Sequence, residues 1–549
     1  MKNLMLALFA LSFLCLSAAS SERHKIEIKI NGLQTNDTLL LLANYYGEQQ
    51  YVKDTIRRNK KGLFVIEGDS AIEGGIYLAV LLPPDPKEKS SEHFEFVITE
   101  QEFKIEAQRG DFIESMKFTD SPENDIYYEY LRFAVRNRTQ QADIKSKISA
   151  SENKLKSRKN YILTSDTLAY DDIDFSDPKV IKIKKVGSDQ WLKINKCDIR
   201  EYTARDKKLY TANFQVGNKQ KTYSFKEEVT EDYRAELKKV GEQLQVYMEN
   251  MIKEHKDKFY PKLFATTKDP VIPEYDSTDT SFPYRYYKKH FFDNLDFSDG
   301  RLVRSPVYHQ RLMKYFDKLV VPQQDSIIKA CEYVLAEASA NYEIFKYTLA
   351  QLLNKYGNSK VMCMDAIYVH LVENYYSTGK ADWVAPDHLR KMQTQAANVK
   401  PTLCGKIAPN LIMQDSSDVW HNLHNIEADY TFILFWDPDC GHCKKAMPII
   451  KEFYEKFEKK ASISMFAVCT EIEIDKWKKF IKEKEIGHWI NVADPHFKTG
   501  FRNLYDINST PKLLVLDKNK KILAKKIAAE QLEEFMENVL KRDQQAQNQ

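Results

Sequence analysis

Two cysteines separated by two residues, Cys440 and Cys443, are the strongest candidates for chemistry in this sequence. They enclose Gly441 and His442 within the stretch FWDPDCGHCKKAMP. Such a pair fits three kinds of site: a structural disulfide, half of a zinc site, or a redox pair in which one thiolate attacks a disulfide and the second thiol resolves the product. The elements that position the two sulfurs distinguish these alternatives.

The pair lies between a predicted buried strand and a predicted amphipathic helix. Residues 431–436, TFILFW, form a short apolar run typical of a central strand, and residues 443–460 have a helical pattern of apolar positions. A sulfur at a helix start meets free backbone N–H groups, which favour the thiolate of Cys440. One turn further on, Cys443 is placed to resolve a mixed disulfide. This position favours redox chemistry over a rigid structural bond.

Other readings of the cysteines have less support. A zinc site needs further ligands, and no second cysteine pair or histidine pair lies nearby, so we expect no metal and no dissociable cofactor. A peroxidatic cysteine would need a threonine just ahead of it, and only Pro438 is present. Trp436 is expected to pack beneath the site and to shape its rim. The remaining cysteines of the mature chain are scattered singly and are expected to be small buried hydrophobes: Cys197, Cys331, Cys363, Cys404 and Cys469.

The length and amino-acid composition are typical of a multidomain globular protein. The chain has 549 residues, which at about 150 residues per domain predicts three or four domains. Hydrophobic residues make up 43% and charged residues 29%, which excludes wholesale disorder. A formal net charge of +3 is small for this length, so nothing indicates a nucleic-acid partner.

The first residues predict export. Lys2 precedes an apolar stretch from Leu4 to Leu16, and small residues follow, so residues 1–19 are expected to be a signal peptide cut after Ala19. No later apolar run reaches the roughly 18 residues that a spanning helix needs. We therefore expect a soluble periplasmic protein with no membrane span in the mature chain.

Residue patterns divide the mature chain into three regions. Residues 22–120 alternate as strands do, which predicts an all-β accessory domain. Residues 121–400 are mainly helical in pattern, with a β-rich insertion at about 161–225. Residues 401–545 alternate between strands and helices, which predicts an α/β layer around a mixed sheet.

Residues 401–545 resemble exported thioredoxin-like thiol:disulfide oxidoreductases of the TlpA/ResA-like family. The resemblance rests on GKIAPNL (405–411), FWDPDCGHCKKAMP, and INSTPKLLVLDKNKKI (507–522). It implies a thioredoxin fold in which Pro511 is cis and faces the cysteine pair, so that Thr510 and Pro511 hold the substrate backbone beside Cys440. The upstream regions resemble the β and helical accessory domains of Bacteroidetes-type relatives.

The sequence departs from the family at two positions. Many thioredoxins carry an aspartate six residues before the first cysteine, where this chain has Leu434, and TlpA/ResA-like proteins often carry a glutamate where this chain has Ala446. Deprotonation of Cys443 must then use water, Asp437, Asp439 or another group. We expect slower resolution of mixed disulfides than in relatives that have the acid.

His442, Gly441 and Trp436 are expected to tune the cysteine pair, and His442 is expected to set its redox potential. The Gly-His pair between the two cysteines resembles that of protein disulfide isomerase, whose redox potential is roughly −180 mV, compared with about −270 mV for thioredoxin. The family resemblance instead implies a reductase of protein disulfides, supplied by an electron donor such as a membrane thiol reductase, and we favour that direction. The alternative is a cell-envelope interaction or assembly protein whose β and helical domains bind a partner while the redox domain is auxiliary.

Overall fold

The computed structural model describes residues 23–33, 39–82, 92–157, 161–163, 170–174, 179–185, 191–195, 199–204, 207–216, 219–227, 230–359, 361–471 and 473–547. The predicted signal peptide and Cys197 lie outside these ranges. Among the described residues, no helix is long and apolar enough to cross a membrane. The chain forms two compact units, of which the first is residues 1–296 with 304–309 and the second is residues 297–303 with 310–549.

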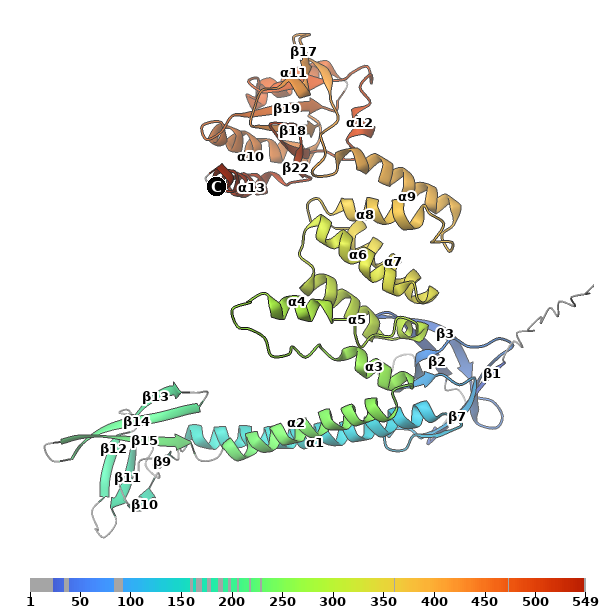
Figure 1. Cartoon of the computed structure of the whole chain (residues 1–549), viewed down its shortest axis with the longest axis vertical. Coiled ribbons are helices and arrows are strands. Elements are labelled where there is room, and N and C mark those ends of the chain that lie inside the picture. The colour runs from blue at the N-terminus through green and yellow to red at the C-terminus, as the bar shows by residue number, and fades with distance from the viewer. Residues whose placement is uncertain are drawn as a thin grey trace, which may run out of the picture. The chain divides into compact units, whose positions relative to one another are not determined.

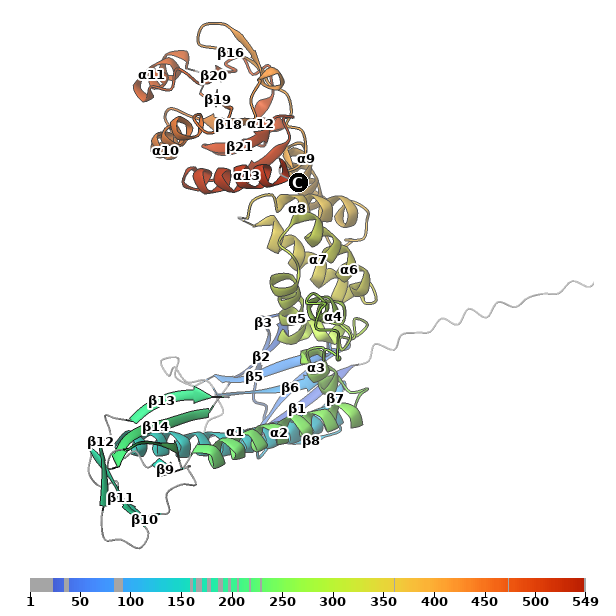
Figure 2. The ribbon, with the colours of Figure 1, turned by 60° about the vertical axis from the view of Figure 1, so that its left-hand side comes forward.

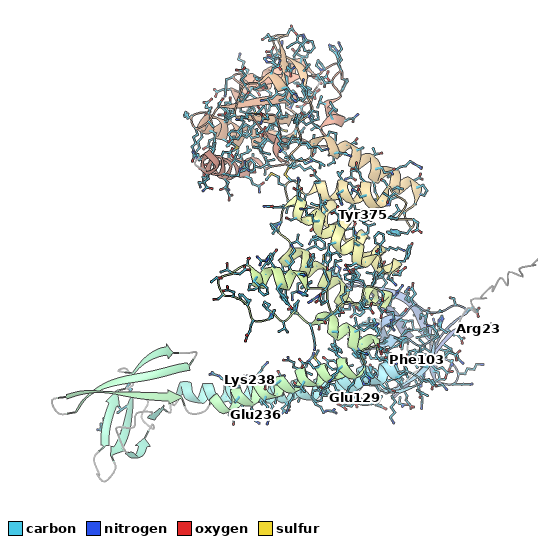
Figure 3. All side chains as sticks on the ribbon, in the orientation of Figure 1. Arg23, Phe103, Glu129, Glu236, Lys238 and Tyr375 are labelled. Atoms are coloured by element: carbon cyan, nitrogen blue, oxygen red, sulfur yellow. A yellow bond between two sulfur atoms is a disulfide. The ribbon has the colours of Figure 1, made fainter. Side chains whose placement is uncertain are left out.

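The N-terminal region is β-rich, as predicted, and contains two four-stranded sheets. Their orders are β4-β1-β7-β8 and β3-β2-β5-β6. Phe96 in one sheet and Phe103 in the other are almost fully buried and have ring centroids 6.2 Å apart, so they contribute to a core between the sheets. Phe103 is labelled in Figure 3. The strands are β1 (His24–Asn31), β2 (Leu39–Tyr46), β3 (Gln49–Arg57), β4 (Leu63–Gly68), β5 (Gly75–Leu82), β6 (Glu92–Ile98), β7 (Glu102–Gln108) and β8 (Lys117–Thr119).

Two long helices follow, α1 (Pro122–Ser157) and α2 (Thr230–Glu254). They lie side by side, as Figures 1 and 2 show, and Phe133 of α1 stacks on Tyr247 of α2 with ring centroids 4.3 Å apart. The residues between them form two small sheets, β10-β11-β12 and β13-β14-β15-β9, in agreement with the predicted β-rich insertion. Their strands are β9 (Tyr161–Leu163), β10 (Tyr170–Asp174), β11 (Val180–Lys185), β12 (Trp191–Asn195), β13 (Ile199–Ala204), β14 (Lys207–Val216) and β15 (Lys219–Glu227).

The rest of the middle region is helical, as the 3.6-residue periodicity predicts. Buried positions recur along α6 and α7, from Ile327 to Ala338 and from Ile344 to Tyr356. The helices are α3 (Phe259–Thr267), α4 (Phe282–Lys289), α5 (Pro306–Lys314), α6 (Gln324–Ala338), α7 (Tyr342–Gly357), α8 (Asp365–Leu371) and α9 (Pro386–Val399), with short helical turns η2 (Gly300–Arg304), η3 (Tyr315–Leu319), η4 (Val372–Tyr376) and η5 (Lys400–Thr402).

The C-terminal region is built on one seven-stranded mixed sheet, in the order β17-β16-β20-β19-β18-β21-β22. The strand β18 lies inside this sheet, parallel to β19 and antiparallel to β21, and every residue in it is buried. The strands are β16 (Ile412–Asp415), β17 (Trp420–Asn422), β18 (Tyr430–Trp436), β19 (Ile463–Cys469), β20 (Ile490–Ala493), β21 (Lys512–Asp517) and β22 (Ile522–Lys525).

Helices cover both faces of this sheet. Apolar residues of α10, α11 and α13 join one core cluster, and Phe501 of α12 joins a second cluster with Ile433 and Phe435. Alternate residues of β18 therefore face the two cores, which explains its unbroken apolar run. The helices are α10 (Gly441–Phe457), α11 (Ile474–Lys484), α12 (Phe501–Leu504) and α13 (Leu532–Gln547), with turns η6 (Leu423–Asn425) and η7 (Ala529–Gln531).

Candidate active site

The cysteine pair lies where β18 gives way to α10. The strand ends at Trp436, and a short turn follows in which the N–H of Cys440 donates to the carbonyl of Asp437 at 3.3 Å. Cys440 is the N-cap residue of α10, and its own carbonyl accepts from the N–H of Lys444 at 3.1 Å. The predicted helix start is therefore confirmed, with Cys440 at the positive end of the helix dipole and Cys443 in the first turn.

The two sulfurs have different environments. Cys440 is half-buried, whereas Cys443 is 1% exposed and belongs to the core. Desolvation raises the pKa of Cys440, but the backbone N–H groups of Cys443 and His442 and the thiol of Cys443 donate to its sulfur, and the net effect lowers that pKa. Burial raises the pKa of Cys443 to about 11. At neutral pH the outer sulfur is thus the better nucleophile, and the inner sulfur keeps its proton.

The segment before β21 lies against the outer sulfur. The thiol of Cys440 donates to the carbonyl of Thr510 at 3.4 Å. The peptide bond between Thr510 and Pro511 is cis, as the family resemblance implied. Because β21 pairs with β18, the segment is held beside the end of the strand that carries the cysteine pair.

A groove of about 630 Å³ runs alongside the pair. His442 is exposed and lines it, together with Thr510 and Pro511. Leu434 and Ala446, the two positions where the sequence departs from the family resemblance, line the same groove and contribute apolar side chains to it. We call this hollow the dithiol groove.

Two family models match the chain. Residues 428–522 match a thioredoxin-like family, and residues 218–399 match a domain of unknown function, DUF5106. The thiol-disulfide oxidoreductase ResA of Bacillus cereus is 29% identical over 140 residues, which are 25% of this chain and 77% of that protein. The chain is a TlpA/ResA-like thioredoxin-like protein. It is accordingly a thiol-disulfide oxidoreductase.

Solved structures also resemble parts of the chain. A domain of a possible thiol-disulfide isomerase from Cytophaga hutchinsonii is 41% identical, over 26% of this chain and 98% of that chain, with a TM-score of 0.25. A thioredoxin-like protein from Bacteroides caccae is 20% identical, over 49% of this chain and 98% of that chain, with a TM-score of 0.39.

Carboxylates gather on one side of the pair in this TlpA/ResA-like domain. Oxygens of Asp437, Asp439 and Glu471 lie within 4.8 Å of one another. Asp439 is exposed and forms an ion pair with Lys476 at 3.0 Å, which lowers the pKa of Asp439. Asp437 is half-buried, and its backbone N–H reaches the sulfur of Cys443. Of the two aspartates expected near the pair, Asp437 is therefore the one whose backbone contacts the inner thiol.

Trp436 does not shape the rim, so that expectation is wrong. Its side chain is fully buried and packs on Phe480 of α11, with ring centroids 4.7 Å apart. The end of β18 is covered by α11, and this covering encloses the indole. Trp436 therefore supports the site only by packing.

Cys363 and Cys404 are not separate buried thiols, which corrects a second expectation. They form a disulfide between the segment before α8 and the segment that enters the thioredoxin-like domain. Sequence spacing carried no sign of this pairing, because 41 residues separate the two cysteines. Cys331 and Cys469 are free and buried, as expected, and burial raises the pKa of Cys469 to about 12.

Proposed function

We propose that this chain is an exported oxidoreductase that reduces disulfides of protein substrates through Cys440 and Cys443. Cys440 attacks one sulfur of a substrate disulfide, the substrate S–S bond breaks, and one substrate thiol leaves with a proton. Cys443 then loses its proton and attacks the sulfur of Cys440, which releases the second substrate thiol. The substrate gains two electrons and two protons, and the chain keeps an internal disulfide.

The observation that carries this proposal is the contrast between the two sulfurs. The hydrogen bonds at the start of α10 lower the pKa of Cys440, and burial raises that of Cys443. A nucleophile needs the thiolate at neutral pH, whereas a resolving group needs it only after the mixed disulfide has formed. The buried inner thiol therefore requires a proton acceptor, and we assign that role to Asp437.

The other residues of the site position the substrate and set the potential. Thr510 and Pro511 dock the substrate backbone next to Cys440. His442 and Gly441 tune the potential of the pair, and the exposed imidazole of His442 favours the reduced form. An electron donor, such as a membrane thiol reductase, then returns the pair to the dithiol. Residues 1–19 direct the chain to the periplasm, where the donor and the substrates meet it.

A Cys443→Ser trap tests the proposal. This variant can form mixed disulfides through Cys440 but cannot resolve them, so periplasmic extract should yield discrete adducts that dithiothreitol releases. A Cys440→Ser, Cys443→Ser double variant is the control and should capture none. If the variant captures no mixed disulfide but copurifies with a tight non-covalent partner, the result would support an interaction or assembly protein.

A measured equilibrium with glutathione tests the direction of electron flow. A reductase should have a potential well below about −180 mV, the value typical of disulfide isomerases. A potential above about −150 mV would instead favour oxidation or isomerisation of substrates.

A further inference from the structure

A second hollow lies next to the dithiol groove and is lined in part by the helical region. This hollow, of about 570 Å³, lies between residues of α9 and the loop before β21, and we call it the α9 hollow. Lys391, Thr394 and Gln395 line it from α9. Asp506 and Asn508 line both this hollow and the dithiol groove. The two hollows therefore form one continuous surface that starts beside Cys440 and continues onto the helical region.

Three contacts hold α8 against the thioredoxin-like domain. The Cys363–Cys404 disulfide is covalent, and Met362 packs on the core cluster that contains Cys443. Asp365 forms an ion pair with Lys525 at the end of β22, and the lysine side chain is only 3% exposed. A buried cation needs such a partner, so this pair fixes the first turn of α8.

The helix α9 is positioned in turn by α8. The hydroxyl of Tyr368 in α8 donates to the side chain of Gln395 in α9 at 3.2 Å, and Gln395 lines the α9 hollow. Lys400, just after α9, forms an ion pair with Glu373, just after α8. The wall of the α9 hollow is therefore attached to the domain that carries the cysteine pair.

The charges along the continuous surface favour an acidic ligand. Asp506 pairs with Lys512, and Asp387 pairs with Arg390. Among the described residues that line the two hollows, the charged side chains left without an ion-pair partner are three exposed lysines and one glutamate: Lys391, Lys445, Lys526 and Glu530. These unpaired side chains carry a net positive charge, and they extend from α10 to α9.

We propose that this surface binds an extended acidic segment of a protein substrate, and that the helical region selects the substrate. The disulfide of the substrate lies at Cys440, an apolar side chain enters the dithiol groove over Leu434 and Leu513, and acidic residues follow the lysines towards α9. This inference rests on the proposed function and gives the helical region a role in it.

Charge reversal on α9 tests the inference in the full-length reduced chain. The probes are two short peptides, each with one cysteine held as a mixed disulfide with thionitrobenzoate, flanked by Asp and Glu in one peptide and by Lys in the other. Release of the coloured thiolate reports the attack of Cys440. Wild type should react about fivefold faster with the acidic peptide, and Lys391→Glu should lose that preference. Lys391→Gln should show an intermediate rate.

A matched control separates the α9 hollow from charge in general. Lys329→Glu makes the same change at an exposed position of α6 that lines neither hollow, and it should keep the preference of wild type. Lys329→Glu should also reduce a free small disulfide without charge, hydroxyethyl disulfide, at the wild-type rate. Equal rates of wild type with both peptides, or equal losses in Lys391→Glu and Lys329→Glu, would overturn the inference and leave the proposed function intact. Failure of wild type with the free small disulfide would overturn both.

Discussion

Cys440 is half-buried and accepts hydrogen bonds at a helix start, whereas Cys443 lies one helical turn away in the core. The same C-x-x-C spacing therefore produces one reactive and one protected thiol. Asp437 and Asp439 both precede the pair, but Asp439 already forms an ion pair with Lys476. The residue that supports resolution is thus expected to be Asp437.

Asp437→Asn should slow resolution of a mixed disulfide by about tenfold, since it removes a proton acceptor while keeping an oxygen that can accept from the N–H of residue 439. The measurement is quenched-flow loss of a mixed disulfide between Cys440 and a peptide. Asp439→Asn is the matched control and should resolve at the wild-type rate. Equal rates in the two variants would contradict the role of Asp437.

Ala446→Glu should accelerate resolution, because it restores a carboxylate at the position where TlpA/ResA-like proteins often have one. Ala446 lines the dithiol groove, so the new side chain has room beside the pair. The same quenched-flow measurement, repeated across pH, tests this variant. No change in rate at any pH would show that the missing carboxylate does not limit resolution.

Lys525 of β22 and Asp365 of α8 are the clearest example of one element stabilising another. Burial lowers the pKa of Lys525, and the neighbouring Asp365 opposes that shift. Asp365→Asn leaves a buried cation without a charged partner, so it should lower the free energy of unfolding by about 3 kcal/mol, as measured by denaturant titration.

The exposed pair Lys479–Glu483 on α11 offers the control for that measurement. Glu483→Gln also removes one carboxylate from an ion pair, but water solvates both partners there. Its denaturation midpoint should match that of wild type. A similar loss in both variants would mean that burial of Lys525 does not matter.

Local patterns predicted the elements around the site well. The apolar run of β18 and the helical periodicity after Cys440 both depend on neighbours in sequence, and both elements are found where expected. The Cys363–Cys404 bond and the Asp365–Lys525 pair join residues that are far apart in sequence, so no local pattern could indicate them. The burial of Trp436 likewise depends on α11, which covers it only in the folded domain.

At the scale of the whole molecule, the Cys363–Cys404 disulfide links the helical region to the redox domain. Replacement of both cysteines by serine removes a crosslink with a sequence separation of 41, which should cost about 4 kcal/mol of unfolding free energy in the chain-entropy model. It should also weaken the preference for acidic peptides, because α8 and α9 are less firmly held. Reaction of Cys440 with a small disulfide should not change. An unchanged peptide preference would show that the crosslink only stabilises the fold.

The rate at which iodoacetamide alkylates Cys440 in the reduced full-length chain tests the central claim most directly, with peptide mass spectrometry to locate the label. Because hydrogen bonds lower the pKa of Cys440, its rate at neutral pH should exceed that of an ordinary surface thiol and should fall as pH drops through that lowered pKa. Cys443 and Cys469, whose pKa values are raised by burial, should stay unlabelled. A rate at Cys440 no faster than that of an ordinary surface thiol would contradict the account.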